Sequence, residues 1–186
     1  RSGASGRTDP TRGWVVLGKE RHNHARYDNL GYPTRALRTD QYLYIHNLKP
    51  DRWPMGDPPR FLCHTKMLNP TKEYILANQE KPGFHQIFEI TYAKRGPEEL
   101  YNVSADPDCL HNLAGDPAHA DLLGELRARL EAILTAQGDP RMLGYGDIFE
   151  SYPYVGRMET DLGGFAEPGR YNPKYLPKTQ TPPPQE

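Results

Sequence analysis

The stretch VVLGKERHNHARYD, residues 15–28, concentrates side chains that could bind an anion. Four of them follow directly on a short apolar run, namely Lys19, Arg21, His22 and Arg26. With Arg35, further along the chain, they could converge on a sulfate, phosphate or carboxylate, because arginine supplies a bidentate fork and lysine a point charge. Glu20 could accept hydrogen bonds from sugar hydroxyls. The stretch therefore favours an anion-binding loop, and a solvated surface turn is the alternative.

A zinc site is a second alternative for the same stretch. His22 and His24 form an H-x-H pair, which in a strand would project both rings from one face, as paired zinc ligands require. A third ligand is also needed. The other five histidines stand at no recognisable metal spacing: His46, His64, His85, His111 and His119. Two surface histidines are therefore the favoured interpretation, and we expect no metal in this chain.

Short strands are expected to position this loop. Residues 14–17 predict the end of a strand. Residues 35–48 predict a β-hairpin that divides at residues 39–41, since apolar and polar or aromatic side chains alternate in its second half with the period of a strand. Residues 49–60 contain four prolines and predict irregular chain. Residues 99–103 predict another strand. Residues 73–78 could form a helix, whereas residues 84–92 could form a helix or a strand.

The strongest element predicted is a helix between Asp116 and Gly138. Asp116 suits the N-cap, Pro117 the first helical position and Gly138 the C-terminal end. An apolar stripe recurs at steps of three and four residues: Leu122, Leu126, Leu130, Ile133 and Leu134. Each large aliphatic side chain contributes roughly 1.5–3 kcal/mol when buried, so this stripe is expected to pack on the sheet.

Composition narrows the function classes. The net charge is -1, which offers no global field for nucleic acid or an anionic membrane, although residues 1–52 hold ten Lys or Arg against five Asp or Glu. This local excess favours an anionic ligand near the N-terminal third. No apolar run approaches the roughly 20 residues of a membrane span. The two cysteines, Cys63 and Cys109, make neither a zinc nor a redox signature.

Three segments in order carry a family resemblance. Residues 18–58, GKERHNHARYDNLGYPTRALRTDQYLYIHNLKPDRWPMGDP, contain a G-[RK]-E-R-H loop, a Y-P-x-R-A-[IL]-R-T strand and an N-[FL]-K-P-[DE]-R-W-P stretch. Residues 98–117, EELYNVSADPDCLHNLAGDP, and residues 138–154, GDPRMLGYGDIFESYPY, follow. Together they resemble the C-terminal part of the formylglycine-dependent sulfatases, especially the heparan N-sulfatase-like branch. Asn102 and Cys109 depart from the usual Asp and Glu of the second motif.

The resemblance implies an α+β fold, the C-terminal subdomain of the alkaline-phosphatase-like sulfatases. That subdomain is a small antiparallel sheet packed by one long helix, with extended irregular segments. Residues 1–13 would be a linker, residues 14–138 the subdomain and residues 139–186 an extended segment rich in Pro, Gly and Tyr. In this family the subdomain rests on a larger N-terminal domain and lends loops to the pocket rim. By the same resemblance, four residues would contact a sulfated carbohydrate substrate: Glu20, Arg21, His22 and Arg35.

The catalytic apparatus of the family is not expected in this chain. Its nucleophile is formylglycine, made from Cys or Ser in a C/S-x-P-x-R motif, and its Ca²⁺ is held by Asp and Asn residues of the N-terminal domain. Neither Cys63 nor Cys109 fits that motif, so the chain alone would be inactive and would bind no cofactor. Its partner would be that catalytic domain. The parent enzyme would be exported, to periplasm, extracellular space or lysosome.

A function of a different class stays open beside this one. The chain could be a non-catalytic module that binds sulfated glycans or another partner. Tight, salt-sensitive binding of heparin fragments to the isolated chain would favour the module, whereas no binding together with exposed apolar surface would favour an enzyme fragment.

Overall fold

The computed structural model describes residues 13–21, 26, 29–58, 61 and 69–152. Four strands and several helices follow one another in these ranges: β1 (Trp14–Lys19), β2 (Thr34–Thr39), β3 (Tyr42–Asn47), α1 (Pro70–Ala77), α2 (Phe84–Thr91), β4 (Glu98–Asn102), the 3-10 turn η3 (Pro117–His119), α3 (Ala120–Ala136) and α4 (Ile148–Ser151).

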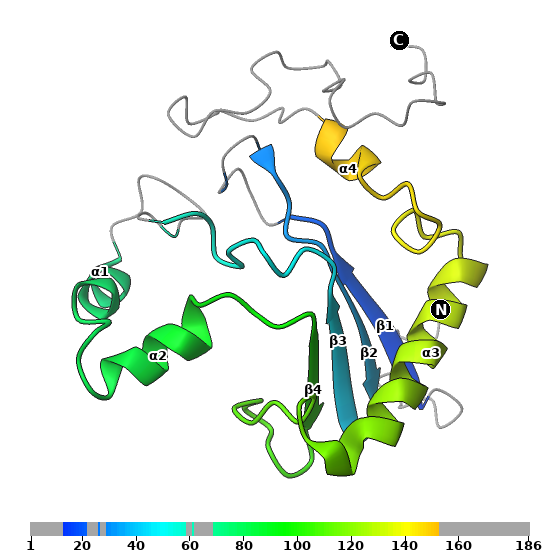
Figure 1. Ribbon diagram of the computed structural model, residues 1–186, viewed down its shortest axis with the longest axis horizontal. Helices are drawn as coiled ribbons and strands as arrows, with labels where there is room; N and C mark the ends of the chain where they lie inside the picture. Colours follow the sequence, from blue (N-terminus) through cyan, green and yellow to red (C-terminus); the bar gives the residue numbers. More distant parts are fainter. Residues whose placement is uncertain (1–12, 22–25, 27–28, 59–60, 62–68, 153–186) are drawn as a thin grey trace, which may run out of the picture.

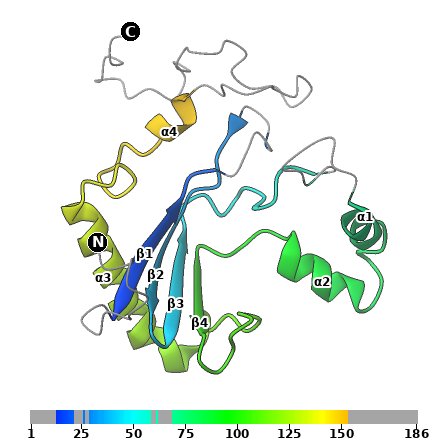
Figure 2. The ribbon, with the colours of Figure 1, turned by 180° about the vertical axis from the view of Figure 1, so that it is seen from behind.

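The four strands form one antiparallel sheet in the order β1-β2-β3-β4. Helix α3 crosses one face of this sheet, while α1 and α2 lie beyond the β4 side (Figures 1 and 2). This is the predicted α+β architecture of a small sheet with one long helix. The predicted hairpin is β2 and β3, and the sequence that could have been helix or strand at residues 84–92 forms α2.

The core lies between the sheet and α3. Leucines of α3, namely Leu123, Leu126, Leu130 and Leu134, meet Leu37, Tyr44 and Leu100 of three strands. Three members of the predicted stripe are thus in the core. Leu122 and Ile133 flank it and are only partly buried, and Leu123 takes the remaining core position. The helix stripe is therefore rotated slightly from the predicted one.

The ends of the long helix are set by the predicted capping residues. The Asp116 carboxylate accepts a hydrogen bond from the Ala118 N–H at 2.9 Å, so the helix begins with the 3-10 turn η3. Gly138 adopts a φ of 75°, which glycine reaches without steric cost, and it follows the last turn of α3. Beyond this glycine the chain turns back towards the end of β1, where the charged loop residues lie.

A second apolar cluster stands apart from the sheet and helix core. The rings of Trp53, Phe61, Phe88 and Tyr92 meet at centroid separations of 5.3–6.0 Å. They join the proline-rich segment after β3 to α2. No helix in the described part of the chain is long and apolar enough to cross a membrane.

Candidate functional site

Among the described residues, the charged side chains predicted to contact substrate lie where β1 ends and β2 begins. In the β1–β2 register Arg35 faces Gly18, and the Arg35 side chain lies across that glycine, where an added Cβ would stand 3.3 Å from Arg35 Cδ. Glu20 and Arg21 follow β1 directly. His22 and His24 lie outside the described residues, so the predicted role of His22 and the zinc alternative stay predictions.

Arg35 is 6% exposed and joins two carboxylates. Its Nε donates to Asp139 Oδ2 and its Nη2 to Glu20 Oε1, both at 2.6 Å. Burial opposes the charge on Arg35, but the hydrogen bonds to Asp139 and Glu20 outweigh it and raise the pKa of the guanidinium. Arg35 therefore holds the start of the loop after β1 against the segment that follows α3.

Glu20 is held from a second side by Arg141. Arg141 Nη2 donates to Glu20 Oε2 at 2.7 Å, so each oxygen of the Glu20 carboxylate accepts from a different arginine. Arg141 also pairs with Asp147 at 3.1 Å and with Glu150 at 3.3 Å. This bridging fixes the direction in which the chain leaves β1.

Glu150 is a second centre of the same network and is 2% exposed. Its carboxylate accepts from the Gly31 N–H at 2.8 Å and from Arg52 at 2.7 Å. Burial alone would raise the pKa of Glu150, but the hydrogen bonds from Gly31 and Arg52 and the charge of Arg141 lower it. Glu150 is therefore a buried carboxylate kept ionised by its surroundings.

Arg21 reaches this network from its edge. Its Nη2 donates to the Phe149 carbonyl and lies 3.8 Å from Glu150, and its side chain keeps 20% exposure. Burial lowers the pKa of Arg21, against the opposing effect of Glu150 and Glu20. Of the predicted arginine contacts, Arg21 is the more exposed one.

Among the described residues, the network contains more positive than negative charge. Its cations are Arg21, Arg35, Lys49, Arg52 and Arg141, and its carboxylates are Glu20, Asp139, Asp147 and Glu150. Five cations against four carboxylates leave a net charge of +1. Such a surplus suits an anionic ligand at the edge of the cluster.

Two more cations flank a buried tyrosine next to this network. Lys19 Nζ lies 5.8 Å and Arg26 Cζ 5.4 Å from the centroid of the Tyr32 ring. Arg26 also donates to the Trp53 and Pro54 carbonyls, and burial lowers its pKa to about 10. Arg26, one of the predicted loop cations, is thus turned inward and is 3% exposed.

A depression of about 290 Å³ opens beside this region. It is lined by Val16, Leu17, Gly18, Lys19, Glu20, Arg35, Leu134 and Asp139. Glu20 and Arg35 therefore share one concave surface with the cation Lys19. Among the described residues, no group of three His, Cys, Asp or Glu side chains could hold a metal ion. The described residues thus offer no ligand set for the Ca²⁺ that the family resemblance assigns to the N-terminal domain.

The sequence reasoning missed the residues that hold this cluster together from the C-terminal side. Asp139, Arg141 and Glu150 all fall in the third segment that carried the resemblance, and Arg52 falls in the first. Their motifs were visible in the sequence, but nothing in their spacing indicated that they meet Glu20 and Arg35, more than 100 residues away for Asp139.

Comparisons with known proteins relate part of the chain to sulfatases. Over 128 residues the chain is 31% identical to the Ulvan-active sulfatase of Formosa agariphila, covering 65% of this chain and 20% of that protein. The chain thus spans about a fifth of the length of that curated relative. No family model matches the sequence.

Two solved structures are similar at a lower level. One is a 2-O GAG sulfatase, with 22% identity and a TM-score of 0.39, covering 69% of this chain and 17% of that chain. The other, from Bacteroides thetaiotaomicron VPI-5482 and described as a sulfatase, has 21% identity and a TM-score of 0.40, covering 72% and 18%. The sequence identity to the Ulvan-active sulfatase relates the chain to sulfatases over part of its length, and the narrower heparan N-sulfatase-like branch stays a prediction.

Proposed function

We propose that this chain is the C-terminal part of a larger enzyme that hydrolyses sulfate esters or sulfamates of a carbohydrate. The observation that carries the proposal is the 31% identity over 128 residues to the Ulvan-active sulfatase. The chain matches a fifth of that protein and would supply a substrate-binding loop, while the nucleophile and the Ca²⁺ ligands would belong to the remainder of the enzyme.

Arg21 is the residue we assign to the anionic group of the substrate. It is a guanidinium at the edge of a cluster with surplus positive charge, and its side chain is 20% exposed. A guanidinium offers a carboxylate or sulfate two parallel hydrogen bonds. His22, the next residue, would contact a hydroxyl or a sulfate oxygen of the same sugar.

Glu20 and Arg35 would act on the loop as well as on the ligand. Both oxygens of Glu20 are engaged by arginines, and Arg35 is bound to two carboxylates. Positioning the loop is therefore the role that their contacts support best. Direct contact of Glu20 with a sugar hydroxyl would use the lone pairs that face the adjoining depression.

Kinetics of the complete parent enzyme test this assignment. Arg21→Ala is expected to lower kcat/KM by about tenfold or more, because a hydrogen bond to a charged group contributes roughly 1.5–3 kcal/mol. Arg129→Ala removes an exposed arginine of α3 and is the matched control, expected to leave kcat/KM unchanged. Equal parameters for Arg21→Ala and the unmodified enzyme would contradict the assignment.

Calorimetric titration of the isolated chain separates the enzyme fragment from a glycan-binding module. We expect no tight binding of heparin fragments at physiological salt, since one arginine and its neighbours form only part of a pocket. Tight binding that weakens steeply with salt would favour the module instead.

A further inference from the structure

The two edge strands of the sheet, β4 and β1, differ in what covers their outward backbone groups. At the β4 edge, the Leu100 N–H donates to Asn112 Oδ1 at 2.9 Å and the Leu100 carbonyl accepts from the Leu113 N–H at 2.7 Å. Asn112 Nδ2 also donates to the Glu98 carbonyl. The segment around residue 112 therefore covers this edge and occupies its backbone groups.

Among the described residues, no segment covers the β1 edge in this way. Leu48 N–H donates to the Pro33 carbonyl at 3.1 Å, and antiparallel pairs alternate between bonded and non-bonded residues. The backbone groups of Pro33 therefore point at β3, and those of Thr34, Ala36 and Arg38 point at β1. Their register partners on β1 are Lys19, Leu17 and Val15. It follows that the backbone N–H and C=O groups of three residues point away from the sheet: Trp14, Val16 and Gly18.

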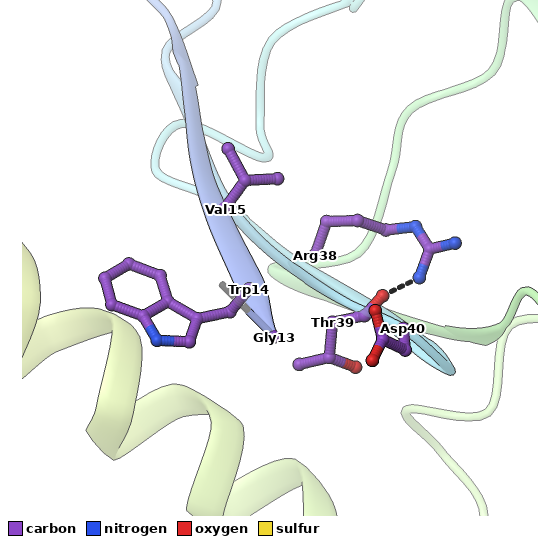
Figure 3. Close-up of a pocket in the computed structure, with 6 residues that line it drawn as sticks. All are labelled: Gly13, Trp14, Val15, Arg38, Thr39 and Asp40. Carbon is purple, nitrogen blue, oxygen red and sulfur yellow. Dashed lines mark hydrogen bonds between the residues drawn. The ribbon is translucent and has the colours of Figure 1, made fainter. Parts of the chain in front are cut away.

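These outward groups lie on an accessible strand. None of them has a hydrogen-bond partner among residues 13–21, 26, 29–58, 61 and 69–152. The side chains of Trp14, Val15 and Leu17 are 39%, 49% and 50% exposed. The depression beside Glu20 borders one end of the strand, and another of about 380 Å³ borders the other end, around Trp14, Arg38 and Asp40 (Figure 3).

Strand edges are usually protected by proline, an inward charge or a bulge, or by a covering segment. The sequence of β1, WVVLGK, has no proline, and its one charge is at the last residue. In Figure 3 Trp14 points towards α3, whereas Val15 points to the opposite face of the sheet. An open apolar edge of this kind is suited to pairing with another strand.

We propose that two copies of this chain associate through β1, paired antiparallel about a two-fold axis at Val16. In this register Val16 faces Val16 of the second copy, and Trp14 faces Gly18. All outward N–H and C=O groups of both strands then pair, which gives six hydrogen bonds, two for each bonded residue pair.

The side chains of this register are complementary. Val15 faces Leu17 of the second copy, so two half-exposed aliphatic side chains cover each other on one face. On that same face Lys19 stands opposite Gly13 rather than a like charge, and on the other face Gly18 has no Cβ opposite the Trp14 ring. A self-complementary strand of this kind favours a second copy over an unrelated partner.

Cross-linking tests the register in a chain with Cys63→Ser and Cys109→Ser. A Val16→Cys side chain meets its own copy at a Cα separation of about 5.5 Å, within the span of about 4.4–6.8 Å that a disulfide bridges. The expected result is a disulfide-linked dimer of twice the 21.2 kDa chain mass on mild oxidation. Val15→Cys is the matched control, because its two copies lie about 8 Å apart and should link poorly. Equal linking of both variants would overturn the register.

Association itself is measured by sedimentation as the chain concentration rises. We expect a concentration-dependent dimer in the unmodified chain and a monomer in Val15→Lys/Leu17→Lys, where a lysine would face a lysine across the axis. Both positions are exposed, so the circular dichroism spectrum should not change. A chain that stays monomeric up to about 1 mM, or a double-lysine variant that dimerises equally, would overturn the proposal.

Discussion

Single residues of the charge cluster fix the geometry of the loop after β1. Glu150 is the most buried of its carboxylates and accepts hydrogen bonds from the Gly31 backbone and from Arg52. Glu150→Gln would leave Arg52 and Arg141 close together without that negative charge. We expect a loss of roughly 3–5 kcal/mol in the free energy of unfolding, measured by urea denaturation. Glu131→Gln, at an exposed position of α3, is the control, and an equal effect of both would contradict this account.

The lowered pKa of Glu150 also predicts a pH dependence. Because the folded-state pKa lies below the unfolded value of about 4.3, the ionised carboxylate stabilises the fold above that pH. This contribution is lost as the pH falls through the folded-state pKa. Urea denaturation from neutral pH to about pH 3 should therefore show a steeper acid loss for the unmodified chain than for Glu150→Gln. Parallel profiles would argue against an ionised buried Glu150.

Gly31 is needed where two loop segments touch. An added Cβ would stand 2.5 Å from the Glu20 carbonyl oxygen, so Gly31→Ala requires a backbone shift next to the Glu20 carboxylate. We expect a loss of about 1–3 kcal/mol in unfolding free energy. Gly124→Ala is a matched control, because a Cβ there meets no atom within 4 Å and alanine favours the helix. An unchanged free energy of unfolding for Gly31→Ala together with a lowered one for Gly124→Ala would contradict this prediction.

At the scale of elements, α3 and the sheet form the support on which the charged loop is built. Leu130 is 1% exposed at the centre of their contact. Leu130→Ala should lower the unfolding free energy by roughly 2–5 kcal/mol, because it opens a cavity between α3 and the strands. Leu143→Ala, at a side chain 45% exposed, should change it little. Thermal or urea denaturation of both variants measures the two changes in unfolding free energy.

The elements were largely predictable from local sequence, because capping residues and apolar periodicity act within a few residues. Asp116, Pro117 and Gly138 marked both ends of the long helix, and the alternation after residue 41 marked β3. The position of Leu123 in the core was not predictable, since it depends on how α3 lies on the sheet. Tyr44 can be buried in the core because its hydroxyl group donates a hydrogen bond to the Glu98 carboxylate. Glu98 lies 54 positions further along the sequence, so this contact is not visible in the local pattern.

At the scale of the whole molecule, the candidate site depends on long-range pairing that a sequence does not display. Glu20 and Arg35 were identified as candidates, but their partners Asp139 and Arg141 come from beyond the last long helix. The cluster joins the loop after β1 to the segment after α3, so a substrate contact by Arg21 would depend on residues from both of these parts of the chain. The reaction would then require a further part of the enzyme that supplies the nucleophile.

Sulfate release is the most direct test of this account. The complete parent polypeptide and the isolated 186-residue chain would be incubated with a panel of sulfated polysaccharides that includes ulvan and heparan sulfate, and free sulfate would be quantified by ion chromatography. We predict sulfate release by the complete polypeptide from at least one polysaccharide and none by the isolated chain. Release by the isolated chain, or none by the complete polypeptide from any of the panel, would contradict the proposed function.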